Sequence, residues 1–566
     1  MLLSDLLERN AKLCGEDTAL VELNPIHDDA KNLSWQEYEL VETGHASHYR
    51  RELTWRAFDE RANRFARLLA DKGIRRGDKV AILLMNCIDW LPIYFGVLKT
   101  GAIAVPLNFR YTAEEIAYCA DLSDARALIF GPEFLDRVGS VRRELAKVAT
   151  YVFVGMDAPD YANSFEGLID RYAPEPPAIE LAEEDDAAIY FSSGTTGFPK
   201  AILHTQASLM SAAVTEQTHH GQTKDDVFLL IPPLYHTGAK MHWFGSLMSG
   251  SRAVILKGTS PQWVLETAAE ERATIVWLLV PWAQDILDAI ENGDVDLSRL
   301  DLSRWRLMHI GAQPVPPSLI KRWKKHFPHH LYDTNYGLSE SIGPGSVHLG
   351  VGNMHKVGAI GKAGHRWRTR IVDGYGAETP QGEVGELIVK GPGVMKEYYN
   401  DPEATAAALR DGWLYTGDMA MEDEDGFIYL VDRKKDVIIT GGENIYPVQI
   451  EDFMRKNDKI KDVAVIGVAD HRLGEIAVAI VELKAGVRAT EEELQSFAGA
   501  LPRYKRPKKI IFDEVPRNPT GKIEKPKLRR KYGADAIVAK ETEIGVETKE
   551  ERICAETEIG VGVRET

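Results

Sequence analysis

The chain has 566 residues, 44% of them apolar, which is enough for several large hydrophobic cores. Its 85 acidic residues outnumber its 68 basic residues and give a formal net charge of −17, which argues against broad attraction to nucleic acid or to an anionic membrane surface. Its four cysteines lie far apart without a C-x-x-C pair, so they indicate neither a zinc site nor a disulfide framework.

The first residues show no basic leader ahead of an apolar segment, and no stretch reaches the roughly 18 apolar residues of a membrane span. We therefore expect a cytoplasmic protein with no membrane span and no nucleic-acid partner. Residues 1–22 predict an amphipathic helix and then a strand, and residues 24–51 form a polar insertion whose role the sequence does not reveal. From Thr54, apolar residues recur at helical spacing as far as Gly73, which suits a helix end.

Strand and helix signals then alternate as far as about residue 365. Thr112 and Glu115 have the spacing of a capping box, and Ser260-Pro261 places proline at a first helical position. Apolar runs that predict strands cover 80–85, 127–130, 187–191, 227–231, 253–256 and 274–280. This alternation is typical of parallel sheets covered by helices, so we expect an α/β fold with layered subdomains.

After about residue 365, short strands and Gly-rich turns predict a β-rich subdomain that extends to 432. The charged run Asp432-Arg-Lys-Lys-Asp436 interrupts the apolar pattern there. We predict an N-terminal domain over 1–432, a small α+β C-terminal domain over 433–533, and an acidic, flexible tail over 534–566. The tail repeats the sequence Glu-Thr-Glu-Ile-Gly-Val at 541 and 556 and has no aromatic residue.

The stretch from Phe191 to Lys200 carries the clearest chemical signal. It follows a predicted buried strand and combines four hydroxyl side chains, two glycines and one lysine. Glycine lets backbone N–H groups approach an anion, hydroxyls donate hydrogen bonds, and lysine adds a positive charge, so the stretch predicts a phosphate-binding loop. Phe198 and Pro199 separate Gly197 from the lysine, which disfavours a Walker-type P-loop.

Further stretches resemble, in the same order, the motifs of the adenylate-forming superfamily of acyl-CoA synthetases, firefly-type luciferases and peptide-synthetase adenylation domains. The phosphate-binding loop is similar to theirs, and the resemblance covers about residues 54–532. The other matching stretches are 232–238, 311–314, 335–340, 415–418, 432–436, 441–444 and 519–522. The resemblance implies that the C-terminal domain is mobile and swings between two reaction poses.

The resemblance also implies which residues carry out catalysis. Lys522 would contact the carboxylate and the α-phosphate during adenylation, and His236 would line the junction between acid and nucleotide. Glu340, assisted by Thr196, would hold Mg²⁺, a cation that prefers carboxylate and phosphate oxygens.

By the same resemblance, ATP and AMP would be bound by the phosphate-binding loop together with residues for the ribose and the adenine. Asp418 and Arg433 would hold the ribose, and Tyr336 would stack on the adenine beside Gly311. The full set is Ser192, Ser193, Gly194, Thr195, Thr196, Gly197, Lys200, Gly311, Ala312, Gln313, Asn335, Tyr336, Gly337, Ser339, Asp418, Arg433 and Lys522.

The remaining assignments concern the acid, CoA and the hinge. Gly441 and Gly442 would border the CoA channel, and Lys435 occupies the position of the hinge residue. The acyl pocket would be lined by His236, Trp243, His309, Gly311, Gly337, Ile342 and Gly343. Glycines together with aromatic residues favour a medium-sized apolar acid, which is medium-chain, aryl or alicyclic, over acetate.

The resemblance thus predicts an AMP-forming acid–thiol ligase that uses ATP, Mg²⁺ and coenzyme A and that forms an acyl-adenylate and then an acyl-CoA. One alternative is an acyl-AMP ligase that transfers the acyl group to a separate carrier protein. An alternative of another class is a non-catalytic nucleotide-binding module. A homodimer is compatible with the sequence, which does not reveal the net direction of the reaction.

Overall fold

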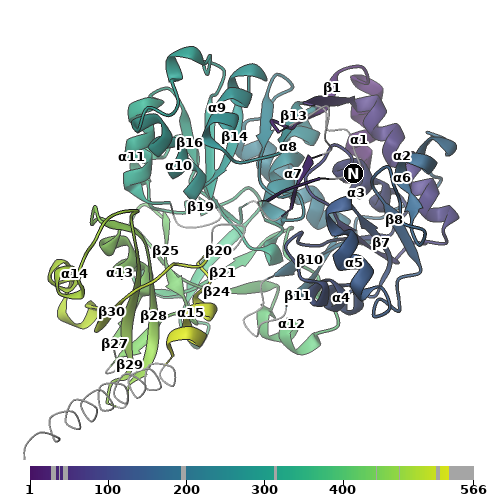
Figure 1. Ribbon diagram of the computed structural model, residues 1–566. Helices are drawn as coiled ribbons and strands as arrows, with labels where there is room; N and C mark the ends of the chain where they lie inside the picture. Colours follow the sequence, from purple (N-terminus) through teal and green to yellow (C-terminus); the bar gives the residue numbers. More distant parts are fainter. Residues whose placement is uncertain are drawn as a thin grey trace, which may run out of the picture. The chain divides into compact units, whose positions relative to one another are not determined.

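The computed structural model describes residues 1–26, 33–36, 39–42, 49–192, 199–311, 315–343, 345–440, 443–470, 472–517 and 523–533. The chain forms two compact units (Figure 1). The first comprises Met1–Thr416 and Met421–Leu430, and the second comprises Gly417–Ala420 and Val431–Thr566. This division lies beside the boundary predicted at 432, whereas the predicted flexible tail lies outside the described residues. The roles assigned to the domains remain predictions.

The first unit contains a seven-stranded sheet that is parallel except at one edge, where β4 runs antiparallel to β1. Its strands, in spatial order, are β16 (Leu331–Asp333), β15 (Leu307–Gly311), β14 (Ile275–Leu279), β12 (Val227–Leu230), β13 (Arg252–Leu256), β1 (Thr18–Leu23) and β4 (Arg50–Thr54). Both faces are buried, because alternate residues of each central strand belong to two different cores. Strands covered on both faces read as continuous apolar runs, which is how β12, β13 and β14 were predicted, whereas β15 was not predicted.

A second sheet in the same unit has eight strands. In spatial order they are β22 (Glu397–Tyr398), β11 (Lys200–Thr205), β10 (Asp186–Ser192), β6 (Ile103–Pro106), β5 (Lys79–Leu83), β7 (Ala125–Phe130), β8 (Thr150–Phe153) and β9 (Asn163–Ser164). Strands β10 and β11 pair antiparallel, so the predicted phosphate-binding stretch joins the two arms of a hairpin. The other paired strands run parallel except β11 with β22.

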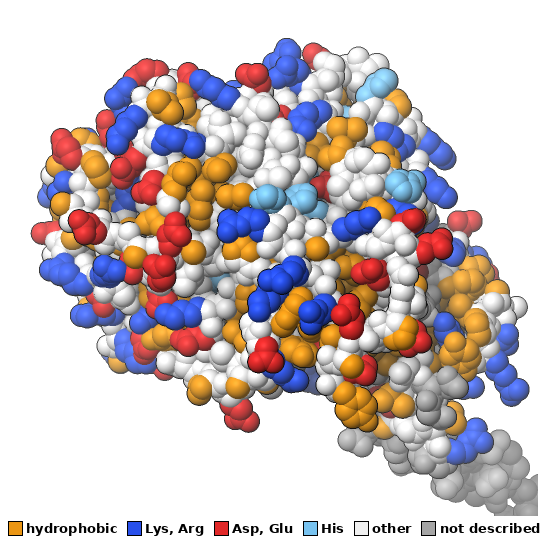
Figure 2. All heavy atoms as spheres, turned by 180° about the vertical axis from the view of Figure 1, so that it is seen from behind, with side chains coloured by type: hydrophobic (Ala, Val, Ile, Leu, Met, Phe, Trp, Pro, Cys, Tyr) orange, Lys and Arg blue, Asp and Glu red, His pale blue; other side chains and the backbone are white. Residues whose placement is uncertain are grey.

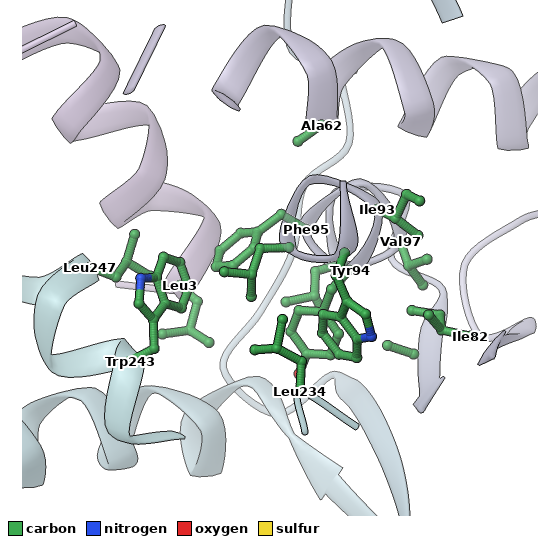
Figure 3. Close-up of a cluster of buried hydrophobic side chains, with 14 of the residues drawn as sticks. Leu3, Ala62, Ile82, Ile93, Tyr94, Phe95, Val97, Leu234, Trp243 and Leu247 are labelled. Carbon is green, nitrogen blue, oxygen red and sulfur yellow. The ribbon is translucent and has the colours of Figure 1, made fainter. Parts of the chain in front are cut away.

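One shared core joins the facing sides of these two sheets. The helices that contribute to it are α1 (Leu3–Leu13), α2 (Trp55–Asp71), α3 (Trp90–Lys99), α7 (Gln206–His220) and α8 (Thr237–Ser249). Every residue of α3 is buried, as expected for a helix with apolar residues all round. Figure 3 shows Trp243 of α8 facing Phe95 of α3, with ring centres 5.9 Å apart.

The outer faces of the two sheets are covered by further helices. These are α9 (Pro261–Glu270), α10 (Val280–Glu291) and α11 (Pro317–His326) on the seven-stranded sheet, and α4 (Ala113–Leu122) and α5 (Leu135–Val141) on the eight-stranded sheet. The predicted helix starts are confirmed at two places. The Thr112 hydroxyl accepts a hydrogen bond from the Glu115 amide while the Glu115 carboxylate accepts one from the Thr112 amide, and α9 begins at Pro261.

Smaller elements complete the first unit. The predicted β-rich region contains β20 (Arg368–Val372), β21 (Gly385–Lys390), β23 (Leu409–Arg410), β24 (Trp413–Glu422) and β25 (Ile428–Arg433), with α12 (Pro402–Ala408) beside β22. Residues 417–420 of β24 and 431–433 of β25 belong to the second unit. A three-stranded sheet contains β17 (Asn335–Tyr336), β18 (Val347–His348) and β19 (Lys362–Ala363), and α6 (Phe165–Leu168) follows β9. Within the 24–51 insertion, β2 (Leu33–Gln36) and β3 (Glu39–Glu42) pair antiparallel.

The second unit has its own α+β fold. Its sheet contains β27 (Glu443–Ile445), β26 (Ile438–Thr440), β29 (Gly474–Leu483) and β28 (Ile460–Asp470), with β30 (Lys509–Phe512) parallel to β29. Its helices are α13 (Pro447–Met454), α14 (Glu491–Ala498) and α15 (Lys525–Tyr532). Two small cores cover the two faces of this sheet.

These layers confirm the predicted α/β class with a small α+β unit. Within the described part of the chain, no helix combines the length and apolar character that crossing a membrane requires. Figure 2 shows Lys and Arg side chains interspersed with Asp and Glu on the face that it draws, without a large patch of one sign.

Candidate active site

The predicted phosphate-binding loop is closed by the pairing of its two ends. Ser192 is the last residue of β10, Lys200 is the first residue of β11, and the two are direct partners in the hairpin. The ammonium group of Lys200 lies 4.8 Å from the ring centre of Tyr398 on β22. The loop residues Ser193, Gly194, Thr195, Thr196 and Gly197 lie outside the described residues, so their phosphate contacts remain predictions.

Tyr398 connects the hairpin to the predicted metal ligand. Its hydroxyl donates a hydrogen bond of 2.9 Å to Oε1 of Glu340. Burial, and then the Glu340 carboxylate, raises the pKa of the phenol, which keeps Tyr398 a donor at neutral pH. The structure therefore brings Lys200 and Glu340 to two sides of one tyrosine that the sequence did not single out.

Glu340 lies in a compact turn that other polar contacts hold in place. It is the middle residue of a 3₁₀-helix, Ser339–Ser341, whose Ser341 hydroxyl accepts a hydrogen bond from the Leu338 amide. Nε2 of His204 on β11 lies 2.8 Å from the Ser339 carbonyl oxygen and donates to it. The turn that carries the predicted metal ligand is thus anchored to the same strand as Lys200.

This arrangement predicts a pH dependence of stability. Burial lowers the pKa of His204 from its ordinary value of 6.5 to about 4, so the folded protein keeps the imidazole neutral where the unfolded chain binds a proton. The neutral His204 therefore contributes to the free energy of unfolding. This contribution is complete above pH 6.5, and about 3 kcal/mol of it is lost as the pH falls toward 4.

The measurement is urea unfolding at pH 7 and pH 4.5 for the wild type and for His204→Gln, whose amide N–H can replace the donor. The free energy of unfolding should fall less in the variant over this interval than in the wild type. Equal falls in the two proteins would contradict the assignment.

Two segments that carry predicted acyl-pocket residues lie against each other, namely residues 236–238 and the turn at Gly343. His236 caps the N-terminus of α8, and its Nδ1 accepts a hydrogen bond of 3.1 Å from the Gly238 amide. A methyl group built on Gly343 would lie 3.2–3.3 Å from atoms of Thr237 and Gly238. Residues 236–238 and 343 therefore face each other, as a pocket shared by these stretches requires.

Gly337 is tightly enclosed, which gives a second prediction. A methyl group built at this position would lie 2.0 Å from the Gly343 carbonyl oxygen, so Gly337→Ala must displace the turn that carries Glu340. Because small misplacements of reacting groups are costly, we expect adenylation to fall by up to roughly 10²-fold. The control is Gly352→Ala, where a methyl group meets nothing within 4 Å and activity should be unchanged. Equal activity of the two variants would contradict this placement.

The predicted nucleotide-binding residues of the first unit lie where parallel strands end. Gly311 is the last residue of β15, and Asn335 and Tyr336 follow the adjacent strand β16. A methyl group built on Gly311 would lie 3.7 Å from the Asn335 side-chain oxygen, so the two residues are neighbours. Ligands of α/β proteins bind preferentially at the carboxyl ends of parallel strands, which favours the predicted role. Ala312 and Gln313 lie outside the described residues.

Two predicted acyl-pocket residues are fully buried. Trp243 packs against Phe58, Phe95 and Phe244 in the shared core, and its place in the pocket remains a prediction. His309, in the middle of β15, lies against other histidines and acidic residues. Burial, and then His220, holds the pKa of His309 well below its ordinary value, so its imidazole is neutral.

In the second unit, the predicted ribose-binding residues form a pair. Nε of Arg433 lies 3.1 Å from Oδ1 of Asp418. Lys435, the predicted hinge residue, is exposed as a residue, while desolvation of its ammonium group and then Arg433 lower the pKa of that group. Gly441, Gly442 and Lys522 lie outside the described residues, and their roles remain predictions.

Comparison with known proteins identifies the family. The AMP-binding enzyme family matches residues 10–399, and the AMP-binding enzyme C-terminal domain matches residues 449–522. The chain belongs to the AMP-binding enzyme family. The FadD13 long-chain-fatty-acid–CoA ligase of Mycobacterium tuberculosis is 34% identical over 485 residues, which cover 85% of this chain and 93% of that protein. A feruloyl-CoA synthase of Amycolatopsis is 33% identical over 85% of this chain and 94% of that protein.

Solved structures of AMP-binding enzymes agree with this result. An anthranilate CoA ligase in complex with anthranoyl-AMP matches with a TM-score of 0.82 and 26% identity over 95% of this chain and 98% of that chain. A Mycobacterium tuberculosis fatty acyl CoA synthetase matches with a TM-score of 0.72 and 30% identity over 94% and 99%. The predicted membership of the adenylate-forming superfamily, in its acyl- and aryl-CoA ligase group, is therefore confirmed.

Sequence reasoning missed Tyr398 and His204, which position Glu340 in this AMP-binding enzyme. Tyr398 follows Glu397 in a two-residue strand that no motif marks, and His204 follows three apolar residues in β11. Neither strand was predicted, so the sequence carried no signal that these side chains contact the turn of Glu340.

Proposed function

We propose that this enzyme joins a medium-sized apolar carboxylic acid, which is medium-chain, aryl or alicyclic, to coenzyme A. The acid attacks the α-phosphorus of ATP to give acyl-AMP and pyrophosphate, and the CoA thiol then displaces AMP to give the thioester. The observation that carries the proposal is the line of side chains from Lys200 through Tyr398 to Glu340 beside the loop of the β10–β11 hairpin. It supports the proposal because a cation of the kind that binds phosphate and a carboxylate of the kind that binds a metal ion contact the same tyrosine.

The residues at this site fit a magnesium ion. Glu340 is half-buried and offers carboxylate oxygens, one of which accepts a hydrogen bond from the neutral phenol of Tyr398. Hard oxygen donors of this kind, completed by ATP phosphates and water, are what Mg²⁺ binds. When bound, Mg²⁺ would offset phosphate charge, and Thr196 would be its second protein contact.

The other residues have positioning roles in this proposal. Lys200 and the loop residues 192–197 hold the phosphates, while Gly311, Tyr336 and their neighbours hold the adenine. Asp418 accepts hydrogen bonds from the ribose hydroxyls beside Arg433, and Lys522 stabilises the charge that develops between the carboxylate and the α-phosphate. His236, with its Nδ1 occupied by the Gly238 amide, presents its other ring edge, and we assign it to the junction of acid and nucleotide.

The second half-reaction needs access for CoA. We propose that the chain segment around Lys435 is the hinge that exchanges Lys522 for Gly441 and Gly442 at the site, because hinges are short segments between compact units. We further propose a cytoplasmic location, which rests on the cysteine pattern. A homodimer also remains a proposal.

The acid class is the part of this proposal most open to experiment. Rates of AMP release should be compared for acetate, octanoate, benzoate, cinnamate, cyclohexanecarboxylate and palmitate in the presence of ATP, Mg²⁺ and CoA. We expect kcat/KM for at least one medium-sized acid to exceed those for acetate and palmitate by roughly tenfold or more. Preference for acetate or palmitate would contradict the proposed class.

A further inference from the structure

A buried cluster of ionisable side chains lies where α7, α8, β15 and β16 meet. Its members are Glu216 and His220 on α7, His242 on α8, His309 on β15 and Asp333 at the end of β16. All five are buried, with relative exposures between 0% and 2%. The adenylation steps proposed above use none of the acidic members of this cluster.

We propose that His220, His309 and Asp333 bind a transition-metal ion, with zinc the best match, at a site separate from the magnesium site. Nε2 of His220 lies 3.0 Å from Nδ1 of His309 and 3.3 Å from Oδ2 of Asp333, and the last two atoms are 4.0 Å apart. An ion about 2.2 Å from all three atoms would lie roughly 0.8 Å out of their plane, and the pair 4.0 Å apart would draw together to roughly 3.4 Å in a tetrahedral site. Zinc bonds to histidine nitrogen and carboxylate oxygen have lengths of about 2.0–2.2 Å.

The orientation of the two imidazoles supports a shared ion. A straight N–H···N hydrogen bond of 3.0 Å would hold the ring centres roughly 5.3 Å apart. Two rings bound in plane to one ion at about 2.0 Å would hold their centres roughly 4.7 Å apart. The observed separation is 4.5 Å. The observed separation is closer to that of two rings bound to one ion than to that of two rings joined by a straight hydrogen bond.

The Asp333 carboxylate has one oxygen bound to backbone amides and the other turned toward the two histidines. Its Oδ1 accepts hydrogen bonds from the backbone amides of Thr334 and Gly350, at 2.8 and 2.9 Å. Among the residues that the structure describes, Oδ2 accepts no hydrogen bond, although the side chain is fully buried. A buried carboxylate oxygen without a hydrogen bond is costly, and a metal bond would offset that cost. His309 and Asp333 are direct partners on adjacent parallel strands, which fixes their spacing.

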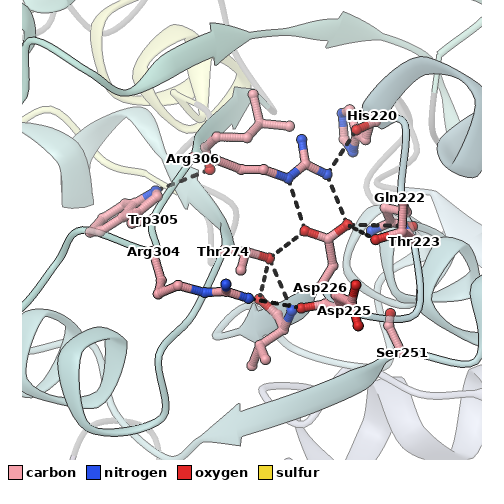
Figure 4. Close-up of polar contacts among 12 residues, drawn as sticks. His220, Gln222, Thr223, Asp225, Asp226, Ser251, Thr274, Arg304, Trp305 and Arg306 are labelled. Atoms are coloured by element: carbon pink, nitrogen blue, oxygen red, sulfur yellow. Dashed lines mark hydrogen bonds and ion pairs between the residues drawn. The ribbon is translucent and has the colours of Figure 1, made fainter.

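The surroundings of His220 match the environment of a metal-bound histidine. Its Nδ1 lies 3.1 Å from a carboxylate oxygen of Glu216, without the alignment of a hydrogen bond, and metal-binding histidines usually present their second nitrogen to such a group. The same Glu216 oxygen lies 2.8 Å from Nδ1 of His242. The His220 carbonyl accepts a hydrogen bond of 3.0 Å from Arg306, whose guanidinium also holds both oxygens of Asp226 (Figure 4). His220, the last residue of α7, is thus held through its carbonyl by Arg306 and faces Glu216 through its ring.

Charge and donor type favour zinc over magnesium. Two buried carboxylates require two positive charges nearby, and one divalent ion supplies both while leaving the histidines neutral. Imidazole nitrogens suit zinc and cobalt, whereas magnesium prefers oxygen donors throughout. Three protein donors leave one position for water or another oxygen donor. The alternative is a metal-free network in which His220 is protonated between Glu216 and Asp333.

The test measures metal content without ATP, so its result is independent of the ligase activity. The full chain is produced in medium supplemented with Zn²⁺ or Co²⁺, because a fully buried site loads most readily during folding, and is then desalted. We expect one metal ion per chain in the wild type and in the control His329→Gln, which changes an exposed histidine. We expect loss of the ion in Asp333→Asn and His309→Asn, and a 10–100-fold weaker affinity in Glu216→Gln.

Cobalt gives a readout that does not require any variant to fold. The wild-type cobalt protein should show the intense visible absorption of a four-coordinate, nitrogen-containing site. Background metal content in the wild type, the weak spectrum of hydrated Co²⁺, or equal metal content in a folded Asp333→Asn protein would overturn the proposal in favour of the metal-free network.

Discussion

Replacing Lys522 with alanine is expected to slow acyl-adenylate formation by roughly 10²–10³-fold, the usual cost of losing one preorganised donor to a developing charge. Carboxylate and α-phosphate are both anions, so the group that contacts both acts mainly when the new bond between them forms. Formation of acyl-CoA from supplied acyl-adenylate should continue, because that step proceeds in the pose proposed to place Gly441 and Gly442 at the site. Separate assays of pyrophosphate release and of thioester formation measure the two effects.

A matched control is available in the same unit. Lys527 lies in α15, and its ammonium group binds Glu524 at 2.6 Å on the surface, so Lys527→Ala removes an equal charge without touching the proposed chemistry. Both half-reactions should be near wild-type rates in this control. Normal adenylation by Lys522→Ala, or equal loss of both half-reactions, would show that the assignment is wrong.

Replacing Glu340 with glutamine is expected to lower the adenylation rate by roughly 10²-fold and to raise the Mg²⁺ concentration needed for half-maximal rate. Glutamine keeps the size of the side chain and can still accept the hydrogen bond from Tyr398, so the change removes mainly the negative charge. The measurement is adenylation rate as a function of Mg²⁺ at fixed ATP.

Tyr398→Phe separates the charge of Glu340 from its positioning. This variant loses one hydrogen bond, a change of about 1 kcal/mol or roughly fivefold, and should keep the wild-type Mg²⁺ dependence. An unchanged Mg²⁺ dependence in Glu340→Gln would exclude Glu340 as the metal ligand. A dependence shifted equally in both variants would assign the effect to the position of the turn.

The sequence predicted the layers of the fold because buried parallel strands produce an unmistakable pattern. The run 227–231 is β12 within one residue, and 253–256 is β13 within one residue. Thr112 and Glu115 revealed a helix start because a capping box is local chemistry. Order of motifs along the chain was sufficient to identify the family.

Features that depend on tertiary neighbours were not predicted. The phosphate-binding stretch connects antiparallel strands, although the alternating pattern suggested a strand followed by a parallel layer. Tyr398 reaches Glu340 across 58 positions of sequence. The histidines of the buried cluster come from α7, α8 and β15, each of which reads as an ordinary core element by itself. Sequence spacing therefore does not indicate that these side chains converge.

The most direct test of the central claim is a stoichiometry. The wild-type enzyme is incubated with ATP, Mg²⁺, CoA and the preferred acid, and AMP and acyl-CoA are quantified over time. An AMP-forming acyl-CoA ligase predicts equal amounts of the two products, with neither formed when the acid is omitted. Acid-dependent pyrophosphate exchange without any CoA thioester would contradict this account and would indicate transfer of the acyl group to a separate carrier protein.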